Sequence, residues 1–70
     1  MANIESPMAA KVWKILVNVG DTIAEDDEVV ILEALKMENP VFAPEDGVVK
    51  EIKVKEGQQV NEDDVLIVLE

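Results

Sequence analysis

The chain has 70 residues, with sixteen acidic side chains against six lysines and a net charge of −10. Because nucleic-acid binding depends on clustered Lys and Arg, and Arg is absent, we expect no nucleic-acid partner. Cys and His are also absent, which removes disulfides, thiolate metal sites and His-activated nucleophiles. No apolar run approaches ~20 residues and no leader segment is recognisable, so we expect a soluble, cytoplasmic protein without membrane insertion.

The first half of the chain is predicted to contain about four short strands, two of which are clear from the sequence. Residues 15–19, ILVNV, alternate in polarity and end at the turn residue Gly20. The acidic block 25–28 is interpreted as a solvated turn, because a calcium loop needs oxygen ligands at alternate positions. Residues 29–32 form a second apolar segment. The stretch 31–40, ILEALKMENP, is typical of the end of a helix by propensity alone.

The second half predicts the same sequence of elements. Residues 44–47, PEDG, have turn chemistry. Residues 52–55 alternate in polarity, and Gly57 marks the turn that follows them. After a second acidic block at 62–64, residues 65–69 are five apolar residues at the end of the chain. This last run is too short for a stable helix and is rich in β-branched residues, so it predicts a strand.

An internal repeat explains this parallel order. Residues 6–33 align without a gap on residues 43–70, and ten of the 28 aligned positions are identical. The identical pairs are Pro7 and Pro44, Val12 and Val49, Ile15 and Ile52, Val17 and Val54, Gly20 and Gly57, the residues 25–27 and 62–64, and 32–33 and 69–70. Since the second copy must end in a strand, the first copy does too, and the helix reading is rejected. The chain therefore predicts one all-β domain, residues 1–70: a sandwich or flattened barrel with pseudo-two-fold symmetry, built from repeats of about 4–33 and 41–70.

The link at residues 34–40 is not duplicated. Pseudo-symmetry places this link, a hairpin, at one end of the body and both chain termini at the other, so that Lys36 lies at the hairpin tip. Leu35 and Met37 flank it with apolar side chains, where a hairpin turn prefers Asn-Gly or Asp-Gly. Such a tip suggests a surface that another protein reads, and a primary amine there is able to accept a prosthetic arm in amide linkage. An ordinary solvated lysine is the plainer alternative.

The hexapeptide at residues 33–38, EALKME, resembles the E-A-M-K-M-E signature of biotinyl domains, the biotin carboxyl carrier modules of biotin-dependent carboxylases and decarboxylases. The resemblance covers almost the whole chain. Residues 6–10, SPMAA, resemble the A-P-M-P-G opening of the family, and residues 19–23 and 56–60 resemble its V-G-D-x-V turn. It implies a barrel-sandwich hybrid of two four-stranded antiparallel sheets, with the target lysine on a protruding hairpin.

The resemblance also implies a function. Lys36 would be the covalent attachment site of biotin, the cofactor, and biotin protein ligase would form the amide bond. The residues that the ligase recognises would be Glu33, Ala34, Leu35, Met37 and Glu38. The arm would carry carboxylate between biotin carboxylase and carboxyltransferase sites, so the domain would be a non-catalytic carrier with no catalytic residue and no metal.

The chain departs from the family pattern at a few positions. Leu35 stands where the family usually has Met, and Ala10 replaces a glycine that Gly47 keeps in the second copy. Asp26 and Asp63 replace a usual turn glycine. Asp tolerates the left-handed backbone conformation better than most residues, so we expect both turns to form at some cost in stability.

Two other functions fit parts of the sequence. A lipoyl domain has the same fold and a lysine on the same hairpin, although its tip typically reads D-K-A, where this chain has Leu-Lys-Met. An unmodified β module that only binds another protein is the second alternative. Replacing Lys36 by Arg separates the unmodified binding module from a carrier, because protein binding would survive and every carrier function would be lost.

Overall fold

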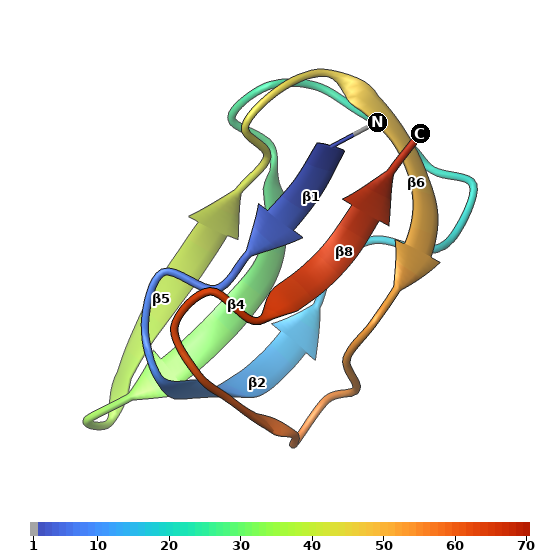
Figure 1. Ribbon diagram of the computed structural model, residues 1–70. Coiled ribbons are helices and arrows are strands. Elements are labelled where there is room, and N and C mark those ends of the chain that lie inside the picture. Colours follow the sequence, from blue (N-terminus) through green and yellow to red (C-terminus); the bar gives the residue numbers. More distant parts are fainter. Residues whose placement is uncertain (1) are drawn as a thin grey trace.

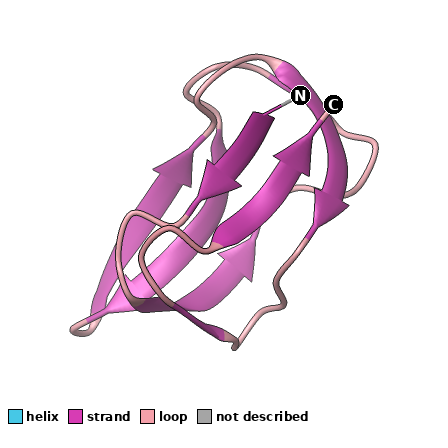
Figure 2. Cartoon of the chain, in the orientation of Figure 1, coloured by secondary structure: helices cyan, strands magenta, loops and turns pink. Residues whose placement is uncertain are grey.

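The computed structural model describes residues 2–70, which form eight strands joined by turns and loops (Figure 2). The strands are β1 (Ala2–Glu5), β2 (Ala10–Ile15), β3 (Thr22–Ile23), β4 (Glu28–Ala34), β5 (Met37–Phe42), β6 (Gly47–Ile52), β7 (Gln59–Val60) and β8 (Val65–Leu69). They pair antiparallel in two four-stranded sheets, in the orders β1-β8-β6-β3 and β5-β4-β2-β7. The predicted all-β class and the two sheets are confirmed. Within this range no helix is long and apolar enough to span a membrane.

The two sheets repeat each other along the sequence offset of the internal repeat. The strands β1, β2, β3 and β4 correspond to β5, β6, β7 and β8, and this substitution converts the strand order of one sheet into that of the other. Even the irregularities repeat, because the bulge between Val12 and Lys14 in β2 has its equivalent between Val49 and Glu51 in β6. The sequence repeat is therefore a pseudo-two-fold repeat of the backbone.

Two reciprocal backbone hydrogen bonds join the halves at their turn glycines. The N–H of Gly20 donates to the carbonyl of Val49 at 2.8 Å, and the N–H of Gly57 donates to the carbonyl of Val12 at 2.6 Å. Both glycines have a positive φ, of 95° and 91°, which a residue with a Cβ adopts only at a cost. These turns therefore bring each repeat into register with the other.

The acidic blocks form two matching turns. Asp26 and Asp63 have φ values of 71° and 72°, as expected for residues that replace a turn glycine. The next aspartate in each block, Asp27 or Asp64, accepts a hydrogen bond from the backbone N–H three residues earlier, at 2.9 and 2.8 Å. These carboxylates satisfy backbone donors of their own turns, which is the usual role of Asp in such a position.

Two predicted strands were misplaced. The sequence places strands at residues 15–19 and 52–55, whereas β2 and β6 each end at the first residue of those ranges. The residues that follow lead from one sheet to the other and pass through the edge of the core, where Val17 and Val54 are buried. The alternation of apolar and polar residues therefore continues beyond the strand, and periodicity alone does not reveal where the ladder stops.

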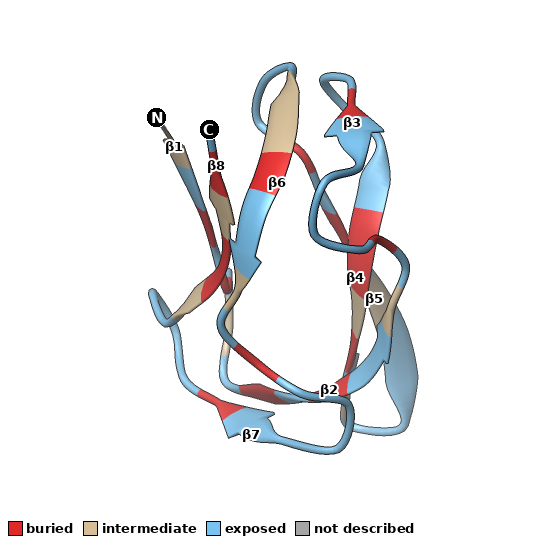
Figure 3. Ribbon diagram, turned by 90° about the vertical axis from the view of Figure 1, so that its right-hand side faces the viewer, coloured by how far each residue is buried: buried red, intermediate tan, exposed pale blue. Residues whose placement is uncertain are grey.

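The core lies between the two sheets, and its buried residues, red in Figure 3, come from strands of both. Its largest fully buried members are Leu32, Leu66, Ile67 and Leu69. Residues 31–40 contribute to this core as the end of β4, a turn and most of β5, in spite of their helical propensity. A helix would turn part of its apolar side chains away from the core, so tertiary packing overrides local preference here.

The two ends of the molecule differ. At one end Ala2 of β1 pairs with Leu69 of β8, which places the two ends of the described chain side by side. The hairpin between β4 and β5 projects from the opposite end of the body (Figure 1). The expectation that the unduplicated link and the chain ends lie at opposite ends is confirmed.

Candidate functional site

The tip of the β4–β5 hairpin is a two-residue turn. Ala34 and Met37 form the last cross-strand pair, and Leu35 and Lys36 connect them with φ values of 53° and 63°. Positive φ at both central residues is characteristic of a type I′ turn, which normally holds Asn-Gly. A left-handed conformation costs an ordinary L-residue ~1–2 kcal/mol. Two such residues at a strained tip point to a function that needs their side chains.

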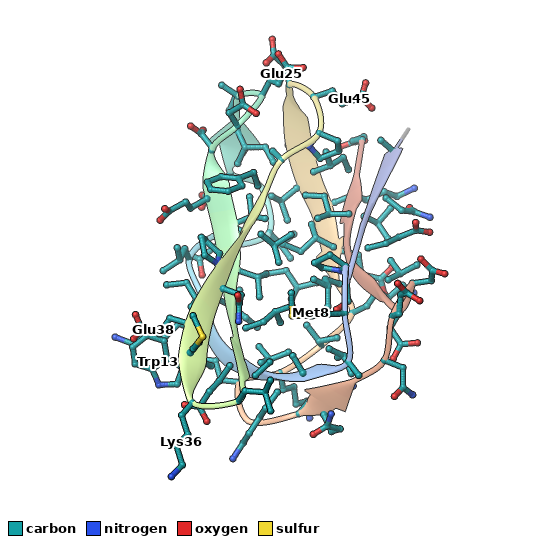
Figure 4. All side chains as sticks on the ribbon, turned by 90° about the vertical axis from the view of Figure 1, so that its left-hand side faces the viewer. Met8, Trp13, Glu25, Lys36, Glu38 and Glu45 are labelled. Atoms are coloured by element: carbon teal, nitrogen blue, oxygen red, sulfur yellow. The ribbon has the colours of Figure 1, made fainter. Side chains whose placement is uncertain are left out.

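Within the described chain, the amine of Lys36 is exposed and has no partner. Its side chain extends away from the body of the molecule (Figure 4). Among residues 2–70 the only ion pair joins Lys53 to Glu51, at 3.2 Å, and no hydrogen bond involves the Lys36 side chain. The amine is therefore accessible to a second protein from the solvent side.

The residues predicted to be recognised by a ligase fall into two groups. Leu35 is 95% exposed and Met37 is 64% exposed, so two apolar side chains flank Lys36 in solvent. Ala34 is half-buried and packs against the core. We infer that Ala34 acts by fixing the hairpin on the body, since its side chain offers little surface to a partner, whereas Leu35 and Met37 offer most of theirs.

The two glutamates of the motif face each other. Glu33 in β4 pairs directly with Glu38 in β5, and both are exposed. On the other side of β4, Lys11 of β2 is the cross-strand neighbour of Glu33. Like charges at directly opposed positions destabilise a sheet by roughly 0.2–1 kcal/mol. The tip thus carries a second unfavourable feature beside its strained turn, and it presents an acidic pair behind the lysine.

Trp13 lies at the same end of the molecule as the hairpin tip and was not predicted from the sequence. It lies in the bulge of β2 and is 41% exposed, with the Nζ of Lys14 5.1 Å from the centre of its ring. Figure 4 shows Trp13 at the same end of the molecule as Glu38 and Lys36. A signal was available in the sequence, because the alignment of the repeats places this tryptophan opposite a charged residue, Lys50.

The opposite end of the described chain is acidic. A shallow hollow there is lined by Glu25, Glu45 and Asp46, and Figure 4 shows Glu25 and Glu45 at the end remote from Lys36. One oxygen of Asp46 accepts a hydrogen bond from the backbone N–H of Glu25 at 2.8 Å, so this carboxylate links two turns. In the described part of the chain, no three acidic groups are arranged to hold a metal ion.

The tip has the chemistry that a covalently attached carboxylic acid requires. An amide bond needs a primary amine that is free of a salt bridge and open to an activating enzyme. Lys36 supplies that amine at a turn whose two residues both project into solvent. The residues present therefore fit a prosthetic group joined through an amide.

Comparison with known proteins gives the family. Residues 2–69 match the family model described as "Biotin-requiring enzyme". The biotin/lipoyl attachment protein of Bacillus subtilis is 53% identical over 62 residues, which cover 89% of this chain and 85% of that protein. The biotin carboxyl carrier protein of Streptococcus mutans is 48% identical over 64 residues, covering 91% of this chain and 49% of that protein.

A solved structure agrees with both. The urea carboxylase of Kluyveromyces lactis contains a region that superposes with a TM-score of 0.91 and 34% identity, covering 97% of this chain and 6% of that one. The chain thus spans most of the Bacillus protein, about half of the Streptococcus protein and a small part of the carboxylase. On these matches the chain belongs to the family of biotin-requiring enzymes and is a biotinyl domain.

Proposed function

We propose that Lys36 is the biotin attachment site and that the chain is a biotin carboxyl carrier domain. The observation that carries this proposal is the free amine of Lys36 on a strained two-residue turn, at the end of the molecule opposite the chain ends. A stability-optimised hairpin would place Asn-Gly there. A lysine between two exposed apolar residues is instead suited to an enzyme that must find one amine among six lysines.

In the attachment reaction this chain contributes only a nucleophilic amine, and the ligase activates the biotin. The Nζ of Lys36, unprotonated, attacks the carboxyl carbon of a biotin that biotin protein ligase has activated as an adenylate. The C–N bond forms, the bond to the adenylate oxygen breaks, and AMP and one proton leave. Exposed Leu35 and Met37 offer the ligase an apolar contact beside the amine, and Glu33 and Glu38 offer an acidic one.

The attached group gives the domain its role. Biotin supplies a ureido nitrogen that accepts carboxylate from a biotin carboxylase and releases it to a carboxyltransferase. The hairpin contributes a fixed base for the arm, because β4 lies inside its sheet between β5 and β2. The domain is a carrier in this scheme, its partner enzymes perform the catalysis, and we place all of them in the cytoplasm.

Intact mass and peptide mapping test the proposal. The chain is expressed together with a biotin protein ligase and free biotin, and we expect one biotinyl group on Lys36 and none on the other five lysines. Lys36→Arg is expected to remain unmodified. The control is Lys50→Arg, which changes an exposed lysine of the second repeat and is expected to load fully.

Two results would contradict the biotin assignment. Failure of Lys36 to gain a group would leave an unmodified protein-binding module. A lipoyl or octanoyl group on Lys36 would assign the chain to lipoyl carriers, an outcome to check because the name of the Bacillus relative covers both groups. Two of the relatives described above are named for biotin or for a carboxylase, which favours biotin over lipoate.

A further inference from the structure

The outer faces of the two sheets differ in polarity at equivalent positions. On or beside the sheet that carries the hairpin, five apolar residues are exposed or half-buried, and we call them the outer patch: Trp13, Leu16, Ile31, Pro40 and Phe42. The offset of the repeat gives their equivalents on the other sheet, in the same order, as Lys50, Lys53, Val68, Asn3 and Glu5. The other sheet thus has a polar or charged residue at four of the five positions.

The outer patch is continuous across three strands. Ile31 of β4 has Pro40 of β5 as its partner on one side and the bulge of β2, which contains Trp13, on the other. Phe42 follows Pro40 by two residues on β5, with one buried residue between them, and so points to the same face. The backbone N–H of Leu16 donates to a carbonyl of β4 at 2.9 Å, which places this residue beside the others.

The fold does not require apolar residues at these positions. Leu16 is 44% exposed and Phe42 is 49% exposed, and their equivalents Lys53 and Glu5 are exposed in the same backbone setting. Lysine and glutamate therefore satisfy the packing of the sheet here. A contiguous exposed apolar patch that folding does not explain marks a surface for another protein.

The charges around the patch restrict what covers it. Glu33 and Glu38 lie between the patch and the hairpin tip, and Glu28 is the cross-strand partner of Phe42. Two lysines of β2 border the remaining side. The chain as a whole has a net charge of −10, so a second copy of it or an anionic lipid surface would be repelled. The favoured occupant is a protein face with an apolar centre and basic side chains around it.

We propose that the outer patch docks on the biotin carboxylase that carboxylates the arm on Lys36, a proposal that rests on the function assigned above. Carboxylation of a ureido nitrogen consumes bicarbonate and ATP, which are both anions, so cationic side chains surround such a site. The acidic border of the patch pairs with these cations, and the patch itself packs on apolar surface between them. The enzyme thus holds the body of the domain while the arm enters its site.

The dimensions of the patch suit a transient contact. Three adjacent strands make it ~10 Å wide, and along β5 it extends from ~13 Å to ~20 Å beyond the tip. With the tip included, this surface is smaller than the interface of a stable complex, which buries about 1,200–2,000 Å². A carrier that must move on to a carboxyltransferase needs such a contact, because a larger one would slow its release.

Carboxylation kinetics with the biotin carboxylase of the same organism test the proposal. The variant Leu16→Lys, Phe42→Glu gives the patch the residues of the other sheet, keeps the net charge at −10 and leaves the tip unchanged. With the biotinylated carrier as the varied substrate, we expect KM to rise about tenfold and kcat to change by less than about twofold, because the patch holds the body of the domain and does not touch the reacting ring. Biotin loading by the ligase is expected to keep the parent rate.

A matched control changes the equivalent positions of the other sheet. The variant Lys53→Gln, Glu5→Gln also keeps the net charge, and its KM is expected to equal that of the parent chain. The KM of the parent chain is expected to rise with ionic strength, because salt screens the complementary charges.

A second measurement needs no variant. In NMR cross-saturation on the loaded parent chain, irradiation of the carboxylase is expected to reduce the methyl signals of Leu16 and Ile31. The methyl signals of Val68, the equivalent of Ile31 on the other sheet, are expected to keep their intensity.

The outcomes separate the two proposals. If mass spectrometry shows no biotin on Lys36, both fail together. If Lys36 is loaded but the patch variant keeps the parent KM, or Ile31 and Val68 lose equal intensity, the attachment site stands and the docking surface is overturned. Slower loading of the variant by the ligase, by the same factor as its carboxylation, would assign the patch to the ligase instead. A dimer of the parent chain in sedimentation that the variant abolishes would assign it to a second copy, and either result overturns docking on the carboxylase.

Discussion

The two repeats have the same backbone and different surfaces. Strand order, bulges, turn glycines and the left-handed aspartates all recur at the same offset. The buried differences are conservative apolar exchanges, such as Val29 and Leu66, and the larger differences lie at the surface. The first repeat continues into the strained turn of Leu35 and Lys36 and carries Trp13, whereas the second repeat ends at the chain end and carries Lys50 in the equivalent bulge.

This comparison separates what the fold needs from what the function needs. A feature present in both repeats is explained by packing and hydrogen bonding, because both halves build the same sheet. A feature present in one repeat, such as the exposed lysine at the tip, needs another reason. The second repeat therefore serves as an internal control for each proposed role in the first.

The largest effect is expected from deleting equivalent core side chains. Leu32 and Leu69 occupy matching positions and are almost completely buried. Leu32→Ala is expected to lower the free energy of unfolding by about 3–5 kcal/mol and Leu69→Ala by about 2–3 kcal/mol. The second loss is smaller because Leu69 lies at the end of β8, where the backbone is freer to close the cavity. Urea unfolding followed by circular dichroism gives both values, and a larger loss at Leu69 would contradict this account.

The next effect comes from relieving the strain of the tip. Leu35→Asn combined with Lys36→Gly gives the turn its preferred residues, and we expect the free energy of unfolding to rise by about 1 kcal/mol. Biotin loading is expected to be lost entirely, as measured by intact mass. The single variant Leu35→Asn retains the amine and is expected to gain about half of that stability. Unchanged or reduced stability in both variants would show that the turn is not strained.

A smaller effect is expected at the two acidic turns. Asp26→Gly and Asp63→Gly each remove a Cβ from a residue with φ near 70°, and we expect each to raise the free energy of unfolding by roughly 0.5 kcal/mol. The two values are expected to agree, because the turns match in φ and in their capping aspartates. Thermal unfolding of both variants tests this, and a difference above the error would show that the repeats are not energetically equivalent.

The smallest effect concerns the acidic pair behind the lysine. Glu38→Gln removes the like-charge contact with Glu33, and we expect a gain in stability of about 0.3 kcal/mol at low ionic strength that disappears in 1 M salt. Unfolding midpoints at two salt concentrations measure it. Glu5→Gln on β1, whose cross-strand partner is the uncharged Val65, is the control for a general charge effect. An equal gain for Glu38→Gln at both salt concentrations would rule out electrostatic repulsion.

The position of Lys36 was predicted correctly from the sequence, whereas several strand boundaries were not. The repeat identified Lys36 as a tip residue, and the structure places it on a two-residue turn. Strand ends were misplaced at residues 15–19 and 52–55 because the segments between the sheets also bury apolar side chains. Trp13 was missed because an aromatic residue in a strand gives no sign, by itself, of facing solvent.

The sequence by itself determined the architecture, since an internal repeat with two turn glycines and two matching runs of β-branched residues favours two matching sheets. It also determined which amine is exceptional, because Lys36 lies in the one segment that the repeat does not copy. Only the tertiary structure decided the conformation of residues 31–40, which prefer a helix locally and become a hairpin because the core needs Leu32 and Val41 on one face. Only the structure placed Trp13 beside the tip, because a bulge and the pairing of β2 with β4 bring together residues that are distant in sequence.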